Sequence, residues 1–261
     1  MAYLARILIF PVKSLEPISV PSAVLTPSGA LRGDRAIALF DEAGKFVNGK
    51  RYPRIHQLRC SFDAVMRTLH LRSADGQLAG SFQMDRQLEP LQEWLGEFFG
   101  VPVQVRENAT TGFPDDTDAP GPTLISTATL SEVASWFPTV TVDSIRLRFR
   151  ANLEIAGVPP FWEDQLFGKA GTARRFQIGN ALIEGTNPCQ RCVVPPRDPA
   201  TGAGYPEFAK IFGARRELTL PSWTERSRFN HFYRLAINTL IPADQAGKTL
   251  HLGDEVRLID N

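Results

Sequence analysis

Short apolar segments separated by turn residues constrain the fold of this chain more than any other feature of its sequence. In the first hundred residues, Arg35–Asp41 and Lys45–Lys50 flank a turn at residues 42–44, and apolar residues alternate along Phe62–Arg67 and Thr68–Arg72. Alternation with a period of two is typical of strands that bury one face. This half of the chain is therefore predicted to consist mainly of β-hairpins.

One helix is expected in the same half. Its apolar residues recur at helical spacing along a single stripe: Leu88, Leu91, Leu95, Phe98 and Phe99. Gly100 follows the stripe directly, at the position where glycine commonly ends a helix. Val101–Arg106 then predicts a returning strand.

Residues 107–122 (ENATTGFPDDTDAPGP) interrupt this pattern, because they carry few apolar side chains and many turn-forming ones. Loops of this length are uncommon inside compact domains and often have a function. We therefore predict a domain boundary in this segment, with one domain at residues 1–110 and a second at residues 120–261.

The second domain is expected to combine strands with short helices. Thr129 and Glu132 have the spacing of a capping box at the start of a helix. The other predicted elements are a helical turn over Trp162–Phe167, a hairpin of Phe176–Ile178 and Ala181–Ile183, a helix over Pro206–Phe212, and closing strands over Phe229–Leu240 and Leu250–Leu258. The predicted fold class is mainly β with short helices (α+β), in two β-rich domains.

Composition excludes several classes of protein. Lys and Arg number 29 against 28 Asp and Glu, so the net charge of +1 creates no general attraction to nucleic acid. No apolar run approaches the roughly 18 residues of a membrane span, and the opening stretch lacks the small-residue cleavage site of a signal peptide. Three cysteines do not make a disulfide scaffold. We expect a cytoplasmic protein without a nucleic-acid partner or a membrane span.

Arginines recur at every second position before residue 152. On a strand, Arg146, Arg148, Arg150 and Asn152 would share one face, because successive side chains alternate between the two faces. Neighbouring guanidinium groups repel one another unless anions or water intervene, so the row predicts a phosphate or carboxylate site. A solvated sheet face remains the competing interpretation.

Cys189 and Cys192 form the only close cysteine pair, and residue types alone leave its role open. The pair could be half of a zinc site, a redox dithiol, two inert buried cysteines, or the source of one soft thiolate ligand to a metal cofactor. Arg191 between them would favour a thiolate.

Five short motifs, in order along nearly the whole chain, resemble those of a known family. They are residues 10–14 (FPVKS), 31–35 (LRGDR), 149–153 (FRANL), 188–194 (PCQRCVV) with the turn at 198–202 (DPATG), and 252–256 (LGDEV). The first two resemble the MOSC amino-terminal β-barrel domain, and the others resemble the MOSC domain. The resemblance implies a MOSC N-terminal barrel followed by a MOSC barrel.

MOSC proteins bind the molybdenum cofactor, a pterin with a dithiolene group and a phosphate. The architecture is similar to the amidoxime-reducing component type, which reduces N-hydroxylated compounds. This resemblance implies that Cys192 is both the metal ligand and the catalytic residue, with soft sulfur suited to molybdenum. It also implies that the following residues bind the cofactor, the last two beside the metal: Lys13, Ser14, Arg35, Arg150, Asn152, Gln190 and Arg191. Arg146 and Arg148 would extend the anion site.

The chain departs from the family pattern at several positions. Ala151 stands in place of a proline and Gln190 in place of a serine, and Pro195-Pro196 replaces a pair of threonines. Proline removes backbone donors, so we expect a reshaped substrate side. No cysteine set for an iron–sulfur cluster precedes Asn261, so electrons for the small-molecule substrate are expected from a separate ferredoxin-, flavoprotein- or cytochrome-type protein.

Two further hypotheses remain. MOSC domains also occur fused to cofactor sulfurases, so the chain could be a cofactor or sulfur carrier module with a persulfide on Cys189 or Cys192. Such a role would depend on a partner, because the sequence contains no pyridoxal-phosphate domain. The third hypothesis is a MOSC-shaped protein that has lost its cofactor, with solvated arginines and inert cysteines.

Overall fold

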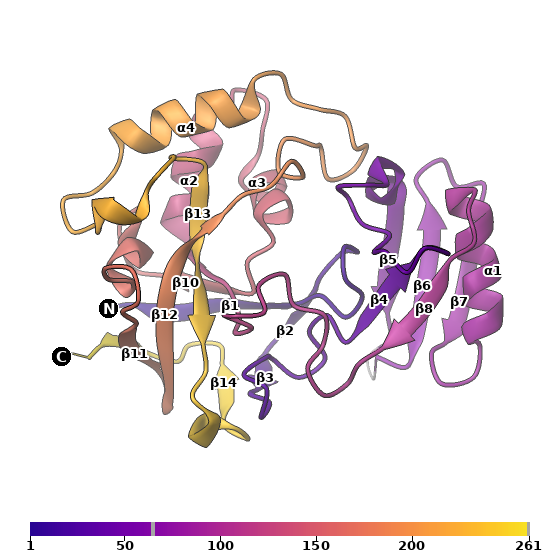
Figure 1. Ribbon diagram of the computed structural model, residues 1–261, viewed down its shortest axis with the longest axis horizontal. Helices are drawn as coiled ribbons and strands as arrows, with labels where there is room; N and C mark the ends of the chain where they lie inside the picture. Colours follow the sequence, from indigo (N-terminus) through magenta and orange to yellow (C-terminus); the bar gives the residue numbers. More distant parts are fainter. Residues whose placement is uncertain (64–65, 260–261) are drawn as a thin grey trace.

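An eight-stranded sheet forms the larger part of the computed structural model, which describes residues 1–63 and 66–259 (Figure 1). In spatial order its strands are β15 (Val256–Leu258), β11 (Arg174–Ile178), β12 (Ala181–Gln190), β13 (Arg234–Leu240), β9 (Leu124–Ser126), β10 (Leu153–Ala156), β1 (Tyr3–Ile9) and β2 (Ile18–Val20). Strands β9 and β10 are parallel, and the other neighbours are antiparallel. The start of the chain is thus paired with strands from its second half.

Smaller sheets complete the β structure. The first lies at the right of Figure 1 and contains β5 (Leu58–Phe62), β6 (Thr68–Ser73) and β7 (Ala79–Gln83). Two strand pairs join distant parts of the chain, namely β4 (Ile37–Phe40) with β8 (Gln104–Glu107), and β3 (Ser22–Val24) with β14 (Thr249–His251). Helix α1 (Leu88–Phe99) lies over the three-stranded sheet and buries Leu91, Leu95 and Phe98.

The second half contributes three further α-helices, and several short 3₁₀ turns occur along the chain. The helices are α2 (Thr127–Ser135), α3 (Val142–Phe149) and α4 (Phe208–Leu218), and the turns are η1 (Pro53–Gln57), η2 (Trp162–Leu166), η3 (Arg226–Arg228) and η4 (Ala243–Gln245). Aromatic rings pack between these segments: Phe137, just after α2, stacks on Phe208 with centroids 4.3 Å apart, and Phe149 contacts Phe212 in a tilted arrangement at 5.5 Å. No helix among the described residues has the length and apolar character needed to cross a bilayer.

The predicted class, mainly β with short helices, is confirmed. No closed barrel is detected among the described residues, however. The start of β1 meets residues 253–256 at one bridge, Tyr3 to Glu255, with three main-chain hydrogen bonds around it. No ladder between β1 and β15 is present in the part of the chain that the structure describes. Closure into a barrel requires every strand to have two neighbours.

Several predicted elements are confirmed. Helix α1 ends at Gly100, which adopts the left-handed conformation (φ 71°) that glycine accepts without strain. The turn at Gly179-Asn180 joins β11 to β12, and a helical turn forms at Trp162–Leu166. The predicted strand Phe62–Arg67 includes residues 64–65, which lie outside the described residues.

Other boundaries were wrong. Helix α2 begins three residues earlier than predicted, because the Ser126 side chain caps it by accepting a hydrogen bond from the Thr129 amide at 3.0 Å. Strand β4 forms its ladder with β8, and Lys45–Lys50 contributes only a bridge from Phe46 to Phe40. The strand predicted over Phe229–Leu240 starts at Arg234.

The predicted arginine-bearing strand is wrong: Val142–Phe149 is helix α3. Thr141 caps the helix by accepting from the Ser144 amide at 3.1 Å. Ile145, Arg148 and Phe149 are its buried residues, so the apolar pattern that fitted a period of two also fitted the helical period. The arginines consequently point in different directions and do not form a row.

A buried carboxyl in η2 makes stability depend on pH. Burial, together with the neighbouring Asp164, raises the pKa of Glu163 from 4.5 to about 7. The folded state therefore favours the protonated form, and the associated stability is present below pH 4.5 and is lost as the pH rises through about 7.

We expect Glu163→Gln to be more stable than wild type above that pH, by at most about 3 kcal/mol, because glutamine stays neutral.

Thermal unfolding of both proteins at about pH 5 and pH 8 measures this effect. The wild-type melting temperature should be lower at pH 8 than at pH 5, and the melting temperature of Glu163→Gln should differ less between the two. An equal pH dependence in the two proteins would show that Glu163 titrates normally in the folded state.

Candidate functional site

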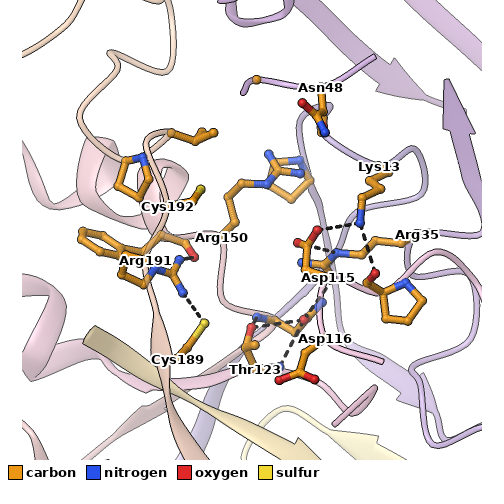
Figure 2. A pocket seen from close by; sticks show the side chains of 18 of the residues that line it. Lys13, Arg35, Asn48, Asp115, Asp116, Thr123, Arg150, Cys189, Arg191 and Cys192 are labelled. Carbon is orange, nitrogen blue, oxygen red and sulfur yellow. Dashed lines mark hydrogen bonds and ion pairs between the residues drawn. The ribbon is translucent and has the colours of Figure 1, made fainter. Parts of the chain in front are cut away.

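A cavity of about 690 Å³ brings both halves of the chain together (Figure 2). Every predicted site residue lines it: Lys13, Ser14, Arg35, Arg150, Asn152, Gln190, Arg191 and Cys192. Cys189 lines it as well. Residues separated by as many as 179 positions in the sequence thus line one cavity. Its volume is in the range of small-molecule and cofactor sites.

The cavity is strongly basic although the chain as a whole is nearly neutral. Nine Lys and Arg residues line it, against four Asp and Glu residues. A concave site lined by an excess of one charge focuses the electrostatic potential and attracts ligands of opposite sign. The arrangement therefore favours an anionic ligand.

Three cations from separate elements line one part of the cavity, and we call Lys13, Arg35 and Arg150 the cation triad. The guanidinium carbons of Arg150 and Arg35 lie 4.2 Å and 5.0 Å from the Phe10 ring centroid. Lys13 Nζ lies 5.0 Å from the Phe46 ring centroid. The main chain at Lys13 is fixed to β4, because its amide donates to the Ile37 carbonyl at 2.7 Å. Arg150 follows α3 and donates to the Leu15 carbonyl at 2.8 Å.

The backbone is strained at two members of the triad and at Ser14, which follows the third. Ser14, Arg35 and Arg150 have φ values of 74°, 50° and 54°, in the left-handed region that non-glycine residues seldom adopt. Such conformations persist only where the surrounding structure imposes them, and they concentrate at binding and catalytic sites. Three of the residues predicted to bind the cofactor are therefore held in one conformation by the fold.

Burial and the neighbouring charges shift the pKa values of Lys13 and Arg150. Burial and the neighbouring Arg35 lower the pKa of Arg150 to about 10. Burial also lowers the pKa of Lys13, although Asp115 opposes the shift. A bound anion would stabilise the charged form of every member, so the triad is electrostatically suited to a phosphate.

Asn152 is buried, and its amide group is fully used within the protein. Its nitrogen donates to the Leu8 carbonyl at 2.9 Å and to Asp34 Oδ1 at 3.0 Å, and its oxygen accepts from Arg35 Nη1 at 3.3 Å. Asp34 in turn pairs with Arg35. Asn152 thus links β1 to the turn that carries Arg35, and its hydrogen bonds position that guanidinium group.

The structure distinguishes the two cysteines of the pair. Arg191 Nη1 lies 2.9 Å from the sulfur of Cys189, and its guanidinium also donates to the Phe149 carbonyl (Figure 2). Arg191 therefore contacts Cys189 directly, whereas sequence alone left open which cysteine it would meet.

Cys60, by contrast, lies outside the cavity lining. Burial raises the pKa of its thiol to about 12, so it remains protonated. The zinc interpretation also lacks ligands, since residues 1–63 and 66–259 contain no group of three or more His, Cys, Asp and Glu that could hold a metal ion.

Arg146 does not line the cavity, contrary to the predicted extension of the anion site. It pairs with Glu154 and Asp143. Arg148 lines the cavity, but its guanidinium donates to the Pro195 carbonyl at 2.9 Å and to Ser144 at 3.0 Å. Their helical spacing turns the two side chains toward different partners.

Sequence reasoning missed Asp115 and His56, which also line the cavity. Asp115 belongs to the segment at 107–122, whose length was a signal of function. His56 carried no comparable signal. Burial and Arg197 lower its pKa to about 4, so the imidazole is neutral at physiological pH.

Comparison with known proteins gives two family matches. The model described as "MOSC N-terminal beta barrel domain" matches residues 1–140, and the model described as "MOSC domain" matches residues 123–257. Relatives include proteins named "Molybdenum cofactor sulfurase" from Caenorhabditis elegans, 32% identical over 130 residues, and from Oryza sativa subsp. japonica, 25% identical over 237 residues. The alignments cover 49% and 73% of this chain but only 17% and 28% of those relatives.

Proposed function

The chain belongs to the MOSC family, and from that premise we propose that its cavity binds the molybdenum cofactor, with Cys192 as the thiolate ligand to the metal. The observation that carries the proposal is the meeting of the cation triad and Cys192 in one basic cavity of about 690 Å³. A phosphate suits the first group and a soft metal suits the second.

The donor set fits the parts of this cofactor. Lys13, Arg35 and Arg150 supply charged donors for the phosphate, and Ser14 adds a hydroxyl beside them. Gln190 and Arg191 flank Cys192 along the chain and supply polar groups near the metal. Each residue type thus matches the chemistry of the cofactor part that it would contact.

The proposed reaction is the reduction of N-hydroxylated small molecules. When bound, the cofactor supplies a metal that exchanges electrons and an oxygen atom with the substrate. The chain's own residues hold the phosphate and present one thiolate. Electrons would come from a separate ferredoxin-, flavoprotein- or cytochrome-type partner.

Molybdenum and pterin content tests the proposal. We expect near-stoichiometric amounts of both in protein purified from a host that makes the cofactor. Cys192→Ser should lose most of its metal and its N-reductive activity, because a hydroxyl is a poor substitute for a soft thiolate. The matched control is Cys60→Ser, which changes the same atom outside the cavity and should keep wild-type metal content. Full metal content and activity in Cys192→Ser would refute this assignment.

A second candidate, a sulfur carrier, is favoured by the contact between Arg191 and Cys189. In this proposal the Cys189 thiolate attacks the terminal sulfur of a donor persulfide, R–S–SH. The donor S–S bond breaks, RS⁻ leaves, and Cys189 becomes Cys–S–SH, so atoms and charge balance without an added oxidant. A thiolate next to a guanidinium is suited to this attack.

Mass spectrometry after incubation with a persulfide donor distinguishes the two candidates. The carrier proposal expects one added sulfur atom on Cys189 that Cys189→Ser prevents and Cys60→Ser does not. If Cys189 stays unmodified in protein that contains molybdenum and turns over substrate, the carrier proposal is refuted and the reductase proposal stands.

A further inference from the structure

Asp115 places a carboxylate in the cavity, against the cation triad (Figure 2). Its Oδ1 lies 2.5 Å from Lys13 Nζ, and its Oδ2 lies 3.8 Å from Arg35 Nε. One carboxylate therefore spans two members of the triad. A phosphate that uses these cations must occupy the same positions.

The residues around Asp115 are anchored, whereas its own side chain is accessible. Lys13 Nζ donates to the Phe113 carbonyl at 2.8 Å, and the Phe113 amide donates to the Arg35 carbonyl at 2.8 Å. On the other side, Asp116 Oδ2 accepts from the Asn238 side chain at 2.8 Å. The Asp115 side chain is 75% exposed. It can therefore rotate into the open cavity while the loop stays in place.

The charges also favour exchange with a phosphate. Asp115 remains ionised, because Arg35 and Lys13 hold its pKa well below the usual range. Asp34 offsets part of the charge of Arg35. If a singly charged anion replaces Asp115, one negative charge is exchanged for another, and the electrostatic attraction to the triad does not increase. A doubly charged phosphate adds one further negative charge beside Arg150 and Lys13, and so gains attraction.

We propose that Asp115 is an internal counter-ion of the cation triad, which a phosphate must displace in order to bind, and that it thereby selects doubly charged phosphate over singly charged anions. The inference rests on the proposed function for the source of that phosphate, which would be the cofactor. It adds a residue whose removal strengthens binding, in contrast to the members of the cation triad, whose removal should weaken it.

Inorganic phosphate is the probe, titrated by calorimetry into protein made in a host that cannot synthesise the cofactor. Asp115→Asn should bind phosphate about tenfold more tightly than wild type, because the apparent affinity is no longer reduced by the fraction of molecules with Asp115 in the site. It should also bind acetate, because the site no longer discriminates against singly charged anions once the counter-ion is removed. The matched control, Asp118→Asn, removes the same charge from an exposed position on the same loop and should bind phosphate as wild type does.

Equal or weaker phosphate binding by Asp115→Asn would overturn the inference, since Asp115 would then contribute to ligand binding or be neutral to it. Absence of measurable phosphate binding by both proteins would also overturn it. Asp115→Ser provides a second variant with the same expected direction, and unchanged melting temperatures confirm that the variants are folded.

The outcome is separable from that of the proposed function. Tighter phosphate binding by Asp115→Asn, in a protein that acquires no molybdenum in a competent host, would support the counter-ion and refute the cofactor. Normal molybdenum content with no effect of Asp115→Asn on phosphate would support the cofactor and refute the counter-ion.

Discussion

Arg150→Gln is expected to lower the affinity for the molybdenum cofactor by about 10- to 100-fold, as measured by pterin release from purified protein and by reconstitution of cofactor-free protein. The physical reason is the loss of a charge-assisted donor from the triad, at the side chain that packs over the Phe10 ring at 4.2 Å. Arg150 also faces Arg35, so its present position costs free energy that a bound anion repays.

The fold of Arg150→Gln should persist. Among residues 1–63 and 66–259, the wild-type guanidinium makes one hydrogen bond, to the Leu15 carbonyl, which a glutamine side chain can partly replace. Arg32→Gln is the control, since it makes the same chemical change at an exposed residue outside the cavity lining. Cofactor affinity equal to that of wild type would contradict the assignment of Arg150 to the anion site, and a large fall in melting temperature would assign Arg150 to folding.

Arg216→Met is expected to destabilise the protein by about 3–5 kcal/mol, the largest stability effect that we predict. Arg216 pairs with Asp164 in the interior, where the two side chains are 1% and 4% exposed. Its guanidinium carbon also lies 4.2 Å from the Phe161 ring centroid. Removing the arginine leaves Asp164 buried without its cation, next to Glu163.

The double variant Asp164→Leu with Arg216→Met separates the cost of an unpaired charge from the value of the pair. Replacing a whole buried ion pair by apolar residues is often neutral or stabilising. We therefore expect the double variant to recover most of the stability that Arg216→Met loses, in urea unfolding at neutral pH. A double variant no more stable than Arg216→Met would show that the pair itself, and not the orphaned carboxylate, accounts for the loss.

The cavity is lined by motif residues from both halves of the chain. Lys13 follows β1, and β1 pairs with β10 of the second half. Asn152 precedes β10 and donates to Leu8 and Asp34 from the first half. The two halves therefore build one site, because the sheet itself crosses from one half to the other.

The sequence motifs led to residues that the fold gathers in one cavity, but they did not reveal how each residue acts. Asn152 was expected to contact the cofactor, and the structure shows in addition that its amide holds Arg35 and Asp34. Arg191 was expected beside the thiolate, and only the coordinates show that its guanidinium meets Cys189. Asp115 carried no motif. Its role follows from a contact with Lys13, which lies 102 positions earlier.

Local chemistry was sufficient for helix α1 and for the hairpin of β11 and β12, because helical spacing with a terminal glycine, or a two-residue turn between apolar segments, acts within a few residues of chain. The same reasoning failed for α3, where Ile145, Arg148 and Phe149 satisfy a helical period as well as Ile145, Leu147 and Phe149 satisfy a period of two. Packing of Phe149 against Phe212 favours the helix, and that contact is not local. The sequence thus determined the class and the family, and it predicted residues that line one cavity. The tertiary structure decided the pairing of charges, because hydrogen bonds and ion pairs depend on positions in space that distant segments set together.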